Sequence, residues 1–123
     1  MTPELNTYLH RYVAGTAPGD KQMLINMCSR FVFARRLGVD EFGIMNNDPR
    51  FAELQEAKRA KEEASRTKEV VATLRQVADD CTDPQRSITA LEVAQAFLVE
   101  AKRDGEPVYF AIGDKIKEFE AKL

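Results

Sequence analysis

Side chains able to perform acid–base or nucleophilic chemistry are few in this chain of 123 residues. It contains one histidine, His10, and two cysteines, Cys28 and Cys81. No acidic residue or second histidine lies three or four positions from His10, so we interpret it as a solvated imidazole on the polar face of a helix. Both cysteines lie far apart in apolar helical segments, which is typical of reduced core thiols rather than of a disulfide or a nucleophile.

Signatures of metal and cofactor sites are also missing from the sequence. Zinc requires three or four ligands brought together, which one histidine and two dispersed cysteines do not supply. The acidic cluster at 79–83 lacks the alternating oxygen ligands, the central glycine and the terminal glutamate of a calcium loop, so we interpret it as a helix end and the cap of the next helix. Neither Gly-x-Gly-x-x-Gly nor Gly-Lys-Ser/Thr occurs. We therefore expect no metal, no cofactor and no enzymatic activity.

Composition indicates a folded chain of one domain. Apolar residues make up 44% of the sequence and charged residues 31%, with a net charge of −2. The length suits a single domain covering residues 1–123. No run approaches the ~18 apolar residues of a membrane span, and the first residues do not resemble a signal peptide, so we expect a cytoplasmic protein that has no contact with membranes.

Apolar residues spaced three and four apart predict an all-α fold, a compact bundle of about five helices. The first helix is expected to begin at Pro3, after the cap Thr2, and to end at Gly15. A second is expected from Asp20 to Leu37. Its apolar residues cover about half of its circumference, so we predict that it is the central helix of the bundle.

Three further helices are expected after residue 48. The longest, over 49–80, is rich in alanine and in charged residues. The next is expected to start at Thr89, which forms a capping box with Glu92. For 107–123 the spacing of apolar residues favours a helix, although 108–112 alone is also compatible with a short strand.

The long helix carries a heptad pattern whose seam is poor in large residues. Small residues permit close approach, so we expect this helix to lie tightly against another one and predict that it also mediates formation of a homodimer. The residues predicted for this self-association are Ala57, Ala60, Ala64, Val71 and Leu74.

A second predicted surface combines basic and aromatic residues. Residues 1–38 carry five lysines and arginines against two acidic residues, while the remaining chain carries thirteen against eighteen. Arg35 lies within an apolar arc, where it either meets the last carbonyls of its helix or belongs to a contact surface. Phe and Arg are favoured at interfaces, so we predict a site for an acidic partner. Its residues are Arg30, Phe33, Arg35, Arg36 and Phe110.

These observations favour a protein–protein interaction module, acting as a small adaptor, an inhibitor or an assembly factor. A bacterial or phage regulator that blocks a larger complex would suit so short a chain. The alternative is a transcriptional regulator that binds nucleic acid through the basic N-terminal third. It is less favoured because no helix-turn-helix signature occurs and because acidic residues interrupt the basic ones.

Overall fold

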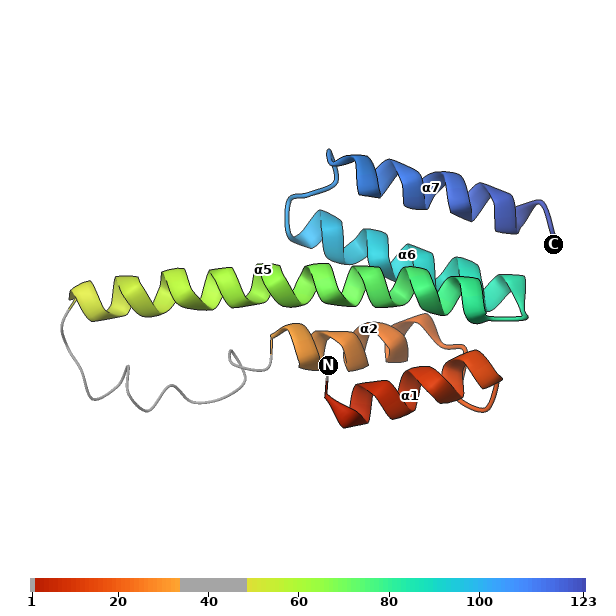
Figure 1. Cartoon of the computed structure of the whole chain (residues 1–123), viewed down its shortest axis with the longest axis horizontal. Helices are drawn as coiled ribbons and strands as arrows, with labels where there is room; N and C mark the ends of the chain where they lie inside the picture. The colour runs from red at the N-terminus through yellow and green to blue at the C-terminus, as the bar shows by residue number, and fades with distance from the viewer. Residues whose placement is uncertain (1, 34–48) are drawn as a thin grey trace.

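The structure, a computed structural model, describes residues 2–33 and 49–123, with the backbone alone for 49–55. Within these ranges the chain forms five α-helices and no strand. They are α1 (Pro3–Ala14), α2 (Lys21–Val32), α5 (Pro49–Asp80), α6 (Pro84–Glu100) and α7 (Pro107–Glu120), arranged as an elongated bundle (Figure 1). The predicted all-α bundle is confirmed. Residues 108–112 belong to α7, so the alternative of a strand there is wrong.

The first helix has the ends that its sequence predicts. The Thr2 side chain accepts a hydrogen bond from the backbone N–H of Leu5 (3.3 Å), and Pro3 occupies the first turn, where a missing N–H costs nothing. Gly15 ends the helix with φ 80°, in the left-handed region that favours glycine. These local signals place α1 without help from the rest of the fold.

The second helix ends earlier than predicted. Asp20 caps its start as expected, and α2 ends at Val32 with Phe33 as its C-cap; residues 34–37 of the predicted helix lie outside the described residues. The guanidinium of Arg66 on α5 donates a hydrogen bond to the carbonyl of Phe31 (3.2 Å) and lies 5.6 Å from the centre of its ring. This side chain satisfies a carbonyl that a longer helix would have bonded internally, which favours termination here.

Helix α6 makes the most extensive packing contacts among the described helices, whereas the second helix was predicted to be the central one. Helix α6 packs against α5 on one side, against α7 on another and also against α2 (Figure 1). Its buried residues fill more than one face, and several of them are small. Ala90 and Ala94 are fully buried, and short side chains of this kind allow neighbouring helices to approach from several directions.

Helices α5 and α6 form an antiparallel pair joined by the turn at 81–83 (Figure 1). The expected close packing of the long helix against another is therefore confirmed. Buried positions of α5 occur only from residue 67 onward among its described side chains, at spacings of three and four: Thr67, Val70, Val71, Leu74, Val77 and Ala78. The half of α5 that precedes them extends beyond α6 (Figure 1).

Three hydrogen bonds tie α6 to its neighbours α5 and α1. The hydroxyl of Ser87 donates to the carbonyl of Ala78 on α5 (2.6 Å) inside the core. On the other side, the Tyr12 hydroxyl donates to the carbonyl of Arg86 (2.8 Å), and the Arg86 guanidinium donates to the carbonyl of Tyr12 (3.2 Å). The guanidinium also lies 5.1 Å from the centre of the Tyr12 ring. These bonds set the position of α1 and α5 against α6.

The start of α6 differs from the prediction. Its N-cap is Asp83, whose carboxylate accepts from the backbone N–H of Gln85 (3.0 Å), with Pro84 in the first turn. Thr89 lies inside the helix and donates its hydroxyl proton to the carbonyl of Gln85 (3.0 Å), so the predicted capping box is wrong. Asp83 and Thr89 are both residues that can cap a helix. The helix begins at the earlier of the two, where Pro84 also favours a first turn.

Replacing Asp83 with alanine is expected to lower the free energy of unfolding by about 0.5–2 kcal/mol, because the α6 N–H groups lose their acceptor. Urea titration followed by far-UV circular dichroism measures the change. Asp83→Asn keeps a side-chain acceptor and should restore most of the stability. Equal losses for the two variants would contradict the assignment of Asp83 as the cap.

Candidate binding groove

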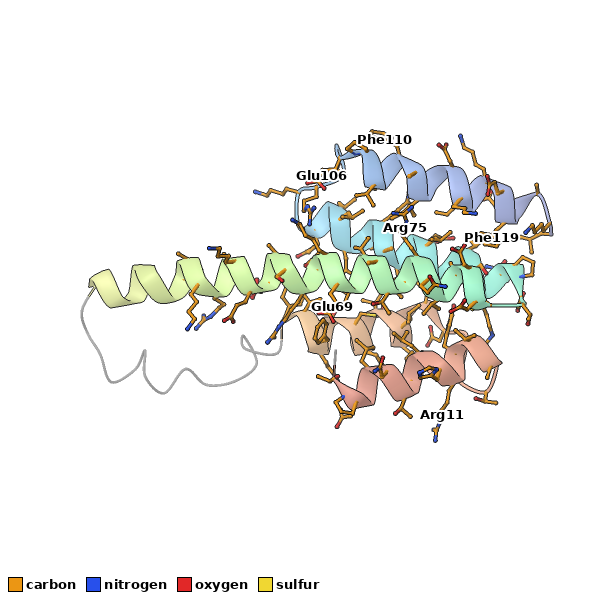
Figure 2. The ribbon with its side chains drawn as sticks, in the orientation of Figure 1. Arg11, Glu69, Arg75, Glu106, Phe110 and Phe119 are labelled. Carbon is orange, nitrogen blue, oxygen red and sulfur yellow. The ribbon has the colours of Figure 1, made fainter. Side chains whose placement is uncertain are left out.

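A groove opens where α5 passes the end of α6 and the start of α7, and we call it the basic groove. Its volume is about 350 Å³, within the size range of ligand sites in proteins. Figure 2 labels Arg75 on the part of α5 beside α6 and Glu106 at the connection between α6 and α7. The groove is lined by Lys68, Val71, Ala72, Arg75, Leu98, Arg103, Glu106, Pro107 and Val108.

The floor of the groove is apolar and its rim is basic. Val71 and Leu98 are core residues that supply the floor, while the exposed Ala72 leaves room above α5. Lys68 and Arg75 are exposed and lie seven residues apart, hence on the same face of α5. With Arg103 and Glu106 the lining carries three positive charges and one negative charge, so its electrostatic potential favours an acidic occupant.

The end of the groove near α7 is held by an ion pair. Arg103 donates to the two carboxylate oxygens of Glu106 through Nε (2.9 Å) and Nη2 (2.7 Å). These hydrogen bonds hold the pKa of Glu106 below its usual range, and the positive charge of Lys68 lowers it further. The same hydrogen bonds raise the pKa of Arg103. The negative charge of Glu106 is thus paired with Arg103. Lys68 and Arg75 of α5 are therefore available to bind an acidic occupant.

A second groove lies between α1 and α2, with a volume of about 570 Å³. Met23 and Met27 contribute flexible apolar surface to it, and Tyr8 also lines it. The charged residues of its lining, Glu4 and Arg11, balance one another. This groove is larger than the basic groove, but its charge does not select between acidic and basic partners.

The predicted basic and aromatic site is not a single surface. Arg30 is exposed on α2, as expected. Phe33 is half-buried against the core and shares a pocket of about 150 Å³ with Thr67 and Phe97. Phe110 is 59% exposed on α7, which packs on the other side of α6 (Figure 2). Arg35 and Arg36 lie outside the described residues.

The residues predicted for self-association divide into two groups. Val71 and Leu74, 4% and 0% exposed, are core residues of the chain itself, Val71 also lines the basic groove, and their role in self-association stays a prediction. Ala57, Ala60 and Ala64 are exposed on α5, where Ala64 lies beside Phe97 and Glu100 of α6, and their role in a homodimer stays a prediction. A monomer by light scattering at high concentration would contradict it.

The residues with catalytic potential remain separate in the fold. His10 is exposed and shares a small pocket with Asp80 from the end of α5. Among residues 2–33 and 56–123, no group of three or more His, Cys, Asp and Glu side chains is arranged to hold a metal ion. The two cysteines are free thiols, with Cys28 buried and Cys81 half-buried.

Thiol labelling of the native protein is expected to modify Cys81 well before Cys28. Burial raises the pKa of Cys28 to about 12 and also raises that of Cys81, so neither is a ready thiolate at neutral pH, but only Cys28 is fully enclosed. Because the folded pKa of Cys28 is the higher one, the stability linked to its protonated form is present below pH 9.0 and lost as the pH rises toward about 12. Reaction with a chromogenic disulfide at pH 8 measures both rates.

The Cys81→Ser variant is the control for this experiment. It should leave one thiol that reacts only after unfolding in urea. Rapid modification of Cys28 in the folded variant would contradict the burial of that side chain.

The sequence reasoning did not find Lys68, Arg75 and Arg103. Their local signal was the spacing of Lys68 and Arg75 on one helix face, which is equally typical of a solvated surface. Arg103 joins them only through the turn that follows α6. Lys21, one of the basic residues of the N-terminal third, forms an ion pair with Glu92 of α6 (2.8 Å).

Comparison of the chain with protein-family models, with curated proteins and with solved structures gives no match. The fold and the groove describe the protein in structural terms: it is an all-α bundle that carries a basic groove with an apolar floor. Within the described residues, none of the helices combines the length and the apolar character that crossing a bilayer requires.

Proposed function

We propose that this protein is a protein-binding module whose basic groove receives an acidic segment of a partner protein. The observation that carries the proposal is the combination of an apolar floor with Lys68 and Arg75 on its rim. Apolar surface in a concave site supplies binding free energy, while charges at the rim select and orient the partner. Adaptors, inhibitors and assembly factors act in this way, by occupying a surface.

Nucleic acid is the weaker candidate for the same groove. Non-specific binding to a duplex depends on neutralising several phosphates, and the groove offers only two cations that are not already matched by an acidic side chain in its lining. The N-terminal third, predicted as the basic surface for this alternative, has Lys21 engaged with Glu92. The net charge of −2 also opposes it.

Site-specific photo-crosslinking in cells that produce the protein tests the proposal. A photoreactive amino acid at Ala72 stands in the groove, and the same amino acid at the exposed Ala96 of α6 is the matched control. We expect a defined protein adduct from position 72 that is absent from position 96. The adduct should disappear when Lys68 and Arg75 are both replaced by glutamate.

Two results would contradict the proposal. Identical adducts from positions 72 and 96 would show that the groove is not the binding surface. A nucleic-acid adduct at position 72 would favour the alternative, and its affinity should then fall steeply as the salt concentration rises.

A further inference from the structure

The spacing of the two cations on the rim restricts what the groove can hold. This inference rests on the proposed function and concerns the shape and charge pattern of the bound segment. Lys68 and Arg75 are separated by two turns of α5, roughly 10.5 Å along its axis. Ala72 lies between them and is exposed. The rim therefore has a short side chain at its middle and a positive charge at each end.

The low middle of the rim suits close packing of another helix. Helices approach to roughly 8–10 Å between their axes, and the distance depends on the side chains at the contact. At Ala72 the side chain is a single methyl group, and the groove beside it reaches down to Val71 and Leu98. One large apolar side chain of the occupant can therefore insert between the two cations.

The spacing also distinguishes a helix from an extended segment. In a helix lying along α5, residues seven apart share a face and repeat at the same roughly 10.5 Å. In an extended segment, side chains on one face lie about 6.6 or about 13 Å apart, and neither distance matches the two cations. An extended segment would also place unpaired backbone groups over an apolar floor, which costs free energy.

The charges of the groove identify the residues that the occupant presents. Neither Lys68 nor Arg75 forms a salt bridge within residues 2–33 and 56–123. Arg103 is matched by Glu106. We infer that the groove binds an amphipathic helix of a partner protein that carries two acidic residues seven positions apart, with a large apolar residue midway between them.

A titration with designed peptides, monitored by the amide resonances of the full-length protein, tests this inference. The probe is a capped helical peptide with glutamates seven positions apart and a leucine midway. Its control has the same composition with the glutamates five positions apart. We expect the probe to shift the resonances of Lys68, Ala72, Arg75 and Val108, and to bind about tenfold more tightly than the control.

Charge reversal makes the test specific to the two cations. The Lys68→Glu, Arg75→Glu variant should lose the probe and should bind a version of it in which both glutamates are lysines. The Lys58→Glu, Lys61→Glu variant changes two exposed lysines of the same helix by the same total charge and should bind the original probe as the wild type does. Circular dichroism verifies that both variants remain helical.

The inference is overturned if the two glutamate spacings bind equally, if the shifts lie outside the groove, or if no shift occurs at millimolar peptide. These failures differ from failure of the proposed function. A protein adduct from position 72 together with equal binding of both peptides would retain the partner site and reject a helical occupant with this spacing.

Discussion

Replacing Leu74 with alanine is expected to lower the free energy of unfolding by about 2–5 kcal/mol. Leu74 is 0% exposed and belongs to the core cluster that joins all five described helices. Removing its three outer carbon atoms loses the free energy gained when they are buried away from water. It also leaves a cavity that the surrounding helices fill only in part. The midpoint of urea unfolding, followed by circular dichroism, measures the loss.

Leu123→Ala is the matched control, since it makes the same substitution at a residue that is 69% exposed. Its free energy of unfolding should stay within about 0.5 kcal/mol of the wild-type value. If the two variants unfolded at the same urea concentration, Leu74 would not occupy the core and the pairing of α5 with α6 would be wrong.

The Ala94→Leu variant tests the central position of α6. Ala94 is 0% exposed, and α6 has neighbours on several sides, so added methyl groups have no empty space to enter. Overpacking of this kind costs about 1–3 kcal/mol because side chains and backbone must shift. Thermal unfolding monitored by circular dichroism should show a lower transition temperature than that of the wild type.

Ala96 provides the control on the same helix, two residues away and exposed. Ala96→Leu should leave the transition temperature nearly unchanged, since leucine is also a good helix former. A large loss at position 96 with none at position 94 would mean that the buried and exposed faces of α6 are reversed.

Local signals were enough to predict the helices themselves. Pro3 and Gly15 delimit α1, and the spacing of apolar residues in 107–123 favoured a helix over a strand. The buried residues of α5 from Thr67 onward recur at spacings of three and four, the spacing that predicted a helix. Each of these features depends on residues within a few turns of one another, and a sequence displays such relations directly.

Tertiary relations were the part that local patterns predicted poorly. The apolar arc of α2 suggested a central helix, but the extent of packing depends on how helices pair in space, and α6 packs more extensively than α2. A carbonyl near the end of α2, that of Phe31, accepts a hydrogen bond from Arg66, which lies more than thirty residues away. The basic groove likewise joins side chains of α5 to the turn after α6, so no single segment of the sequence displays it.

The unequal burial along α5 has an energetic consequence. From Thr67 onward, opening the helix means separating its buried side chains from the core, whereas residues 56–65 contribute no buried side chain to that core. Isolated helical stretches of this length are marginal in water. The amides of residues 56–65 should therefore exchange with solvent deuterium faster than those from Thr67 onward, because opening them exposes less buried surface.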